Sequence, residues 1–139
     1  MPKLTQEIFI PRKIVQNLLH HAQQTPDVEV CGLISSQNNI PVRSYAIKNS
    51  SDKPSTLFTL DAQQQISAMA EMRDNKQQLF AIYHSHPTAP AIPSKTDLEQ
   101  AGYPEALYLI ISLNVKGIME IRGYQLQEMS FIEVALTLS

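Results

Sequence analysis

Two almost uninterrupted apolar runs constrain the fold of this chain more than any other feature. Residues Leu79–Tyr83 read LFAIY, and residues Leu107–Leu113 read LYLIISL. A strand that is apolar along its whole length must be covered on both of its faces. The two runs therefore predict the inner strands of a sheet that lies between two layers, and they argue against a sheet with one face in water.

The remaining segments alternate between helical and extended patterns. Apolar residues recur at helical spacing after Pro11 and after Asp61, and a shorter helix is expected from Ser94 to about Ala101. This order favours an α/β or α+β fold with a central mixed sheet flanked by helices. The 139 residues contain no repeat or linker, so we expect a single domain over residues 1–139. Besides the two apolar runs, strands are expected at Leu4–Ile10, Val28–Ser35, Ile40–Lys48, Thr56–Leu60, Val115–Leu126 and Ser130–Leu138.

Composition excludes several classes of function. The formal net charge is -2, from 11 Lys and Arg against 13 Asp and Glu, which is not typical of a nucleic-acid binder or a polybasic membrane anchor. The single cysteine, Cys31, excludes an intramolecular disulfide and a multi-cysteine zinc site. The N-terminal residues lack the apolar core of a secretory signal, and no apolar run is long enough for a membrane span. We therefore expect a cytoplasmic protein.

His84 and His86 directly follow the first apolar run. Residues two apart on a strand point to the same face of the sheet, so both imidazoles can converge on one point. Two imidazoles at this spacing suit zinc. Taken alone, however, the pair is more typical of strand-end histidines that hydrogen-bond to the backbone or to water.

Ser94 and Asp97 lie a short distance further along the chain. The pattern Ser-x-x-Asp is typical of a capping box at the start of a helix. A capped first turn is compatible with a second role, in which Asp97 offers its carboxylate to a metal held by the two histidines. Two histidines and one carboxylate would leave a fourth position on a catalytic zinc for water.

A zinc-bound water also needs a base that takes its proton. Glu29 is a candidate because it precedes an apolar strand, where partial desolvation would make its carboxylate a better base. Taken alone, Glu29 is more typical of an exposed loop carboxylate.

Together these residues resemble the signature of the JAMM (MPN+, Mov34/MPN/PAD-type) metallopeptidase family. That signature places a Glu ahead of a Cys-Gly strand, followed by H-[ST]-H-x7-S-x2-D. Seven residues, Pro87–Pro93, separate His86 from Ser94, and two residues separate Ser94 from Asp97. The matching residues are Glu29-Val30-Cys31-Gly32, His84-Ser85-His86-Pro87, Ser94 and Asp97, and the segment Asn49–Pro54 leading into Phe58 and Asp61 is also similar to the family.

The resemblance implies a cytidine-deaminase-like JAMM/MPN fold with one zinc ion per chain. His84, His86 and Asp97 would hold the zinc together with one water. Glu29 would be the general base, and Ser94 would hydrogen-bond the oxyanion of the tetrahedral intermediate. The resemblance implies that Ser85 positions other residues and is not catalytic. A free cysteine on an apolar strand, such as Cys31, is typically a small buried side chain and not a nucleophile.

The substrate class also follows from the resemblance. The chain looks like the small prokaryotic members, which hydrolyse a peptide or isopeptide bond next to the C-terminal Gly-Gly of a ubiquitin-like or sulfur-carrier protein. Such a deubiquitinase-like isopeptidase would bind an extended tail, which could add a strand to a sheet edge. An exposed sheet edge would also be compatible with a homodimer.

Three other classes of protein share parts of this pattern. A non-catalytic MPN-type scaffold typically lacks one or more ligands, whereas this chain keeps all three and the base. A zinc deaminase would need cysteine ligands that one cysteine cannot supply. A metal-free structural domain is the third alternative, and metal content would distinguish it. Two imidazoles and a carboxylate would also suit iron, cobalt or nickel.

Overall fold

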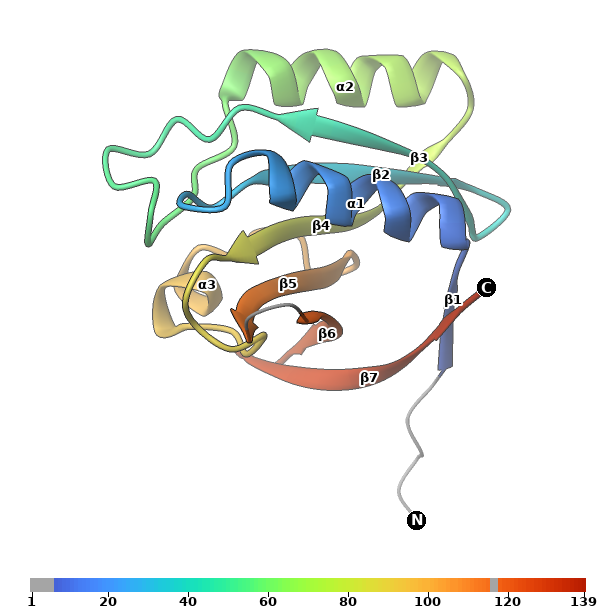
Figure 1. Ribbon diagram of the computed structural model, residues 1–139. Coiled ribbons are helices and arrows are strands. Elements are labelled where there is room, and N and C mark those ends of the chain that lie inside the picture. Colours follow the sequence, from blue (N-terminus) through green and yellow to red (C-terminus); the bar gives the residue numbers. More distant parts are fainter. Residues whose placement is uncertain (1–6, 116–117) are drawn as a thin grey trace.

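The centre of the fold is a mixed sheet with a helix on each face (Figure 1). The computed structural model describes residues 7–115 and 118–139. Within them, seven strands follow the order β1-β7-β6-β5-β4-β2-β3. The pairs β1–β7 and β4–β5 are parallel, and the other pairs are antiparallel. The elements are β1 Glu7–Ile10, α1 Arg12–Gln24, β2 Cys31–Gln37, β3 Ile40–Ile47, α2 Ala62–Asp74, β4 Gln78–His86, α3 Lys95–Glu99, β5 Leu107–Val115, β6 Ile118–Gln127 and β7 Ser130–Leu138.

The two apolar runs form the inner strands β4 and β5, as predicted. Alternate residues of these strands belong to two separate hydrophobic clusters, because successive side chains of a strand point to opposite faces. Tyr83 and Leu109 pack in the cluster that contains Leu18 of α1. Ile82 and Ile110 pack in the cluster that contains Met72 of α2. The predicted mixed sheet flanked by helices is therefore confirmed.

Gly32 explains why the Cys-Gly dipeptide suits the start of β2. A Cβ atom at this position would lie 2.5 Å from ring atoms of Tyr83 and closer still to the carbonyl oxygen of Tyr45. Both neighbours belong to the strands that flank β2, so neither can move without disturbing the sheet. A residue without a side chain is therefore required where β2 passes between β3 and β4.

Several expected elements differ from the structure in their bounds or their type. The predicted strand Thr56–Leu60 is wrong, because only a single bridge joins Leu60 to Asn49. The side chain of Asn49 bonds the backbone of this segment instead, accepting from Thr59 N at 3.0 Å and donating to Leu57 O at 3.0 Å. The strand expected to begin at Val28 begins only at Cys31. The short helix expected to reach about Ala101 ends at Glu99.

Another difference concerns the predicted strand Val115–Leu126. Val115 is the last residue of β5, and β6 begins at Ile118. Residues 4–6 of the first predicted strand and residues 116–117 lie outside the described residues. Among the described residues, no helix is long and apolar enough to cross a membrane.

Candidate metal and catalytic site

His84 and His86 lie at the carboxyl end of β4 and project to the same side of the sheet. Their Nε2 atoms are 3.1 Å apart. Both residues are almost fully buried, with exposed fractions of 3% and 4%. The period of the strand therefore brings the two imidazoles together, as the sequence predicts.

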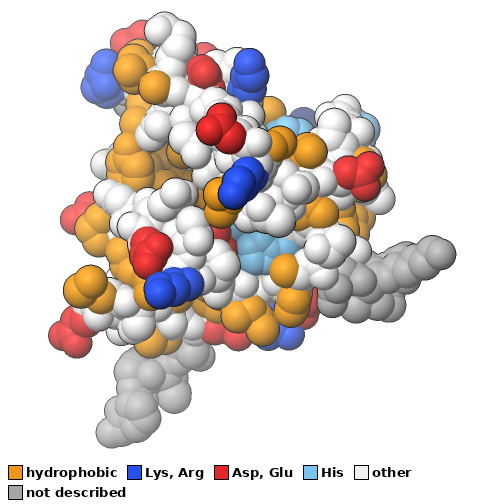
Figure 2. All heavy atoms as spheres, turned by 90° about the vertical axis from the view of Figure 1, so that its left-hand side faces the viewer, with side chains coloured by type: hydrophobic (Ala, Val, Ile, Leu, Met, Phe, Trp, Pro, Cys, Tyr) orange, Lys and Arg blue, Asp and Glu red, His pale blue; other side chains and the backbone are white. Residues whose placement is uncertain are grey.

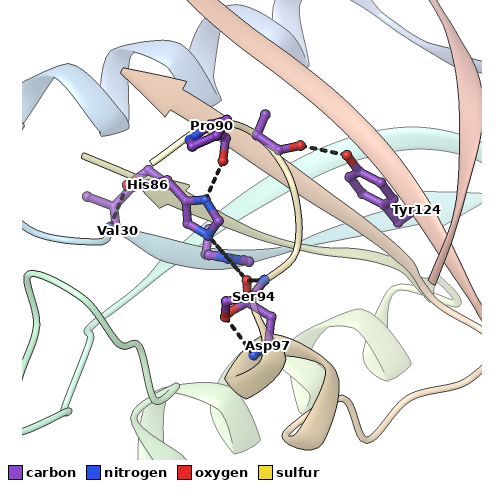
Figure 3. A network of polar contacts seen from close by, with 9 residues as sticks. Val30, His86, Pro90, Ser94, Asp97 and Tyr124 are labelled. Carbon is purple, nitrogen blue, oxygen red and sulfur yellow. Dashed lines mark hydrogen bonds and ion pairs between the residues drawn. The ribbon is translucent and has the colours of Figure 1, made fainter. Parts of the chain in front are cut away.

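Asp97 reaches the same point from α3. Its Oδ2 atom lies 3.2 Å from Nε2 of His84. The same atom lies 3.2 Å from Nε2 of His86 (Figure 3). The predicted capping box holds this carboxylate in place, because Oδ2 accepts from Ser94 N at 2.9 Å while Ser94 Oγ accepts from Asp97 N at 3.0 Å. The metal-ligating atoms of the two histidines and the aspartate all lie within 4.8 Å of one another.

A backbone carbonyl sets the orientation of His86. Nδ1 of His86 donates to the carbonyl oxygen of Pro90 at 2.8 Å (Figure 3). This bond leaves the lone pair on Nε2, so the nitrogen that faces Asp97 is the one able to bind a metal. Histidine ligands of metals in proteins are commonly oriented in this way.

The proline-rich loop after β4 is fixed to the neighbouring strands. Ser112 Oγ of β5 donates to the carbonyl oxygen of Ala89 at 2.8 Å. Tyr124 of β6 donates its hydroxyl to the carbonyl oxygen of Ala91 at 2.6 Å (Figure 3). Sequence reasoning missed both residues. Their bonds keep the carbonyl of Pro90 in reach of His86.

The charges of the three converging side chains match what a divalent cation requires. Burial alone would raise the pKa of Asp97, but hydrogen bonds from His84 and His86 hold that pKa well below its usual range. Burial lowers the pKa of His84, so this imidazole is neutral near pH 7. Burial also opposes protonation of His86, but hydrogen bonds to Asp97 and Pro90 raise its pKa.

Glu29 lies beside this cluster, immediately before β2. The residue is 5% exposed, and its Oε1 atom has no hydrogen-bond partner among the described residues. Burial raises the pKa of Glu29 to about 7, while His86 lowers it and Asp97 raises it further. A carboxyl group that titrates near neutral pH can both accept and release a proton. The structure therefore places Glu29 in a desolvated setting, not in an exposed loop.

Four hydrogen bonds hold the backbone around Glu29, and in one of them Glu29 N donates to the carbonyl oxygen of Pro54 at 2.7 Å. Val30 N donates to Ser85 Oγ at 2.9 Å, and Ser85 N donates to the carbonyl oxygen of Val30 at 3.0 Å. Asn49 Nδ2 donates to the carbonyl oxygen of Glu29 at 2.9 Å. Ser85 thus connects β4 to the segment that carries Glu29, in keeping with a positional role.

Phe58 was not predicted as part of the site. Its ring stacks on the imidazole of His84, with centroids 4.4 Å apart and an angle of 20° between the planes. Next to this pair lies a cavity of about 380 Å³, and His84 and Asp97 form part of its wall. In Figure 2, histidine atoms are visible in a hollow bordered by hydrophobic side chains.

Cys31 does not belong to the chemical part of the site. It is buried, and its Sγ lies 3.4 Å from the carbonyl oxygen of Ile47, to which it donates. Burial, followed by the charge of Glu29, raises the pKa of its thiol to about 12. A thiol in this state is not a nucleophile at neutral pH, which confirms the interpretation of Cys31 as a small buried side chain.

A mixed sheet that carries a histidine pair, a helix-borne aspartate and a buried glutamate defines a JAMM-type domain. In agreement, residues 11–126 match the Prok-JAB family, the prokaryotic homologues of the JAB domain. The chain belongs to this family and is a small prokaryotic member of the JAMM type.

Several curated proteins are similar to this chain. The CysO-cysteine peptidase of Mycobacterium tuberculosis is 29% identical, over 86% of this chain and 82% of the relative. The desampylase of Haloferax volcanii is 28% identical, over 69% and 73%. The probable TtuB-protein conjugate cleaving protease of Thermus thermophilus is 28% identical, over 68% and 63%.

Solved structures agree with the fold. A solution structure of a protein from Desulfitobacterium hafniense has a TM-score of 0.84 and 28% identity, covering 96% of this chain and 93% of that one. A solution structure of a protein from Salinibacter ruber has a TM-score of 0.69 and 26% identity, covering 94% and 90%.

Proposed function

We propose that this protein is a zinc-dependent peptidase or isopeptidase. It would hydrolyse the bond that follows the C-terminal Gly-Gly of a ubiquitin-like or sulfur-carrier protein. The observation that carries the proposal is the desolvated carboxylate of Glu29 beside the converging side chains of His84, His86 and Asp97. The names of the relatives, a peptidase, a desampylase and a conjugate-cleaving protease, support hydrolysis of such conjugates.

The residues present fit one zinc ion. His84 and His86 offer two imidazole nitrogens, Asp97 offers one carboxylate oxygen, and His86 is oriented by Pro90. Three protein ligands of this kind are typical of catalytic zinc, which keeps one position open. When bound, zinc would polarise the scissile carbonyl and lower the pKa of a water molecule.

The chain's own side chains would move the proton and bind the developing charge. Glu29 would accept a proton from the attacking water and pass it to the amine that leaves. Ser94 would donate its hydroxyl proton to the carbonyl oxygen of the substrate. That proton is free for this purpose, because the bond between Ser94 and Asp97 N uses only the lone pair of Oγ.

The proposal also covers the location, the domain organisation and the substrate-binding edge of the protein. The protein would act in the cytoplasm as a single domain over residues 1–139. The extended tail of the carrier would add a strand at an edge of the sheet, where β3 and β1 lie at opposite ends. The same exposed edges would allow a homodimer.

Metal analysis and a cleavage assay test the proposal together. The parent protein should bind about one zinc per chain, as a mononuclear catalytic site does, and should cleave Gly-Gly-tailed carrier fusions. Glu29→Ala should keep the zinc and lose cleavage, whereas His86→Ala should lose both. Glu99→Gln, which changes an exposed glutamate of α3, is the matched control and should behave as the parent does. A parent that takes up no zinc, or undiminished cleavage by Glu29→Ala, would overturn the proposal.

A further inference from the structure

The cavity beside the candidate metal cluster is lined mainly by apolar side chains. It measures about 380 Å³, and β4, β5 and β7 supply Ile82, Ile110 and Phe131 to its wall. Phe58 closes the side next to His84, on which its ring is stacked. Among the described residues that line the cavity, only Asp97 carries a charge.

Both tyrosine hydroxyls in the wall already take part in hydrogen bonds within the protein. Tyr108 OH accepts from Tyr103 N at 2.9 Å and donates to the carbonyl oxygen of Tyr103 at 3.3 Å. The hydroxyl of Tyr103 in turn accepts from Gln65 Nε2 at 2.8 Å. These bonds fix the loop after α3 against β5 and α2, so the cavity is preformed and selects for apolar groups.

The position of the cavity restricts which part of a substrate can enter it. Its wall includes His84 and Asp97, so an occupant lies next to the bond that is cleaved. On the carrier side, that bond is preceded by two glycines, which have no side chains. The third residue before the bond is about 7–10 Å away in an extended chain. The residue on the leaving side therefore has the side chain that lies nearest to the cleaved bond and to this cavity.

We propose that this cavity binds the side chain of the residue that is released, and that this side chain is large and apolar, such as that of Phe, Leu or Met. The inference rests on the proposed function. The released residue is joined to glycine through its α-amine: the C–N bond breaks, the hydroxyl of water joins the glycine carbonyl carbon, and the amine leaves with the proton. A lysine ammonium would find no carboxylate in the wall other than Asp97, which the metal would occupy.

Substrates that differ only in the released residue test this assignment. One Gly-Gly-tailed sulfur-carrier protein is extended by a single Phe, Leu, Ala, Asp or Lys, and a further substrate carries lysine linked through Nζ. Values of kcat/KM for Phe and Leu should exceed that for Ala by about 10–100-fold, which is the discrimination that an apolar pocket supplies. Equal rates for all residues, or a preference for the Nζ-linked lysine, would overturn the assignment.

Variants of the wall provide the second arm. Ala101→Leu would fill part of the cavity, and Phe131→Ala would enlarge it. Each should reduce the ratio of the Phe rate to the Ala rate, while zinc content stays unchanged. An unchanged ratio in both variants would contradict the proposal. Because Ala101 lies on the surface loop after α3, Ala101→Leu remains informative if the variant in β7 fails to fold.

A binding arm separates failure of this inference from failure of the proposed function. The zinc-loaded Glu29→Ala protein is titrated with acetyl-Gly-Gly-Phe-amide and acetyl-Gly-Gly-Ala-amide, and NMR shifts are followed at Tyr108 and Phe131. Tighter binding of the Phe peptide with shifts at these residues supports the cavity assignment even if no fusion is cleaved. Equal affinity, or no shifts at the cavity, would overturn the assignment even if cleavage is observed.

Discussion

The two faces of β4 differ in what their buried side chains do. Tyr83 and Ser85 face α1, and His84 and His86 face α3, yet all four are almost fully buried. On the α1 face, polar atoms are bound to other parts of the sheet and its helix. Tyr83 OH lies 2.7 Å from Nδ1 of His21, and Ser85 bonds the backbone of Val30 in both directions.

On the α3 face, the polar atoms converge on one another. The nitrogens of His84 and His86 and the carboxylate of Asp97 lie within hydrogen-bond distance of one another. One oxygen of Glu29 has no hydrogen-bond partner in the part of the chain that the structure describes. Equal burial therefore comes with polar atoms bonded within the protein on one face, and with three side chains close enough together to hold a metal ion on the other. The two faces can be told apart by the hydrogen-bond partners of their buried polar atoms. In a stable core these atoms bond to other groups of the protein.

The largest effect is expected on the α1 face, at Gly32. Gly32→Ala would place a Cβ atom 2.5 Å from the ring of Tyr83, and neighbouring strands prevent relief. Overpacking of this kind should lower the free energy of unfolding by about 3 kcal/mol or more, measured by urea denaturation. Gly102→Ala is the matched control, because the nearest atom to its Cβ lies at 4.0 Å. Equal stability of the two variants would contradict the packing of β2 described here.

Ser85→Ala should show that the α1 face supports stability without affecting the ligands. The substitution leaves the buried N–H of Val30 without its acceptor, which should cost about 1–3 kcal/mol in the free energy of unfolding. Zinc uptake should stay within a factor of two, since His84 and His86 keep their own partners. Loss of zinc with unchanged stability would reverse the proposed division between the two faces.

The sequence predicts the parts of this site that depend on local periodicity. The strand period places His84 and His86 on one face, and the Ser-x-x-Asp pattern predicts the cap that aims Asp97. The inner position of β4 and β5 follows from their apolar runs. These features could be predicted because each depends on residues that are close together in the chain.

Features that depend on the order of strands were not predictable from local patterns. The cavity joins Phe131 of β7 to Phe58 of a loop, and no periodicity relates these two residues. The strand expected at Thr56–Leu60 fails for a similar reason, because one distant side chain, that of Asn49, takes the backbone bonds that a ladder would need. Pro90 contributes through its carbonyl oxygen, an atom that every residue has.

Glu29→Gln should have an effect on stability that is no larger than that of Ser85→Ala and of the opposite sign. In the folded metal-free protein, burial raises the pKa of Glu29 from an ordinary value of 4.5 to about 7. A raised pKa of an acid means that stability is fully present below pH 4.5 and is lost as the pH rises through about 7. The neutral amide avoids this loss, so above pH 7 the variant should be more stable than the parent by about 1–3 kcal/mol.

Urea denaturation at pH 5 and pH 8 in the presence of a chelator measures this difference in stability. Glu99→Gln controls for the loss of one negative charge. If the free energy of unfolding of the parent and of Glu29→Gln depends on pH in the same way, burial of Glu29 does not destabilise the protein. The α3 face would then not differ from the α1 face in this respect.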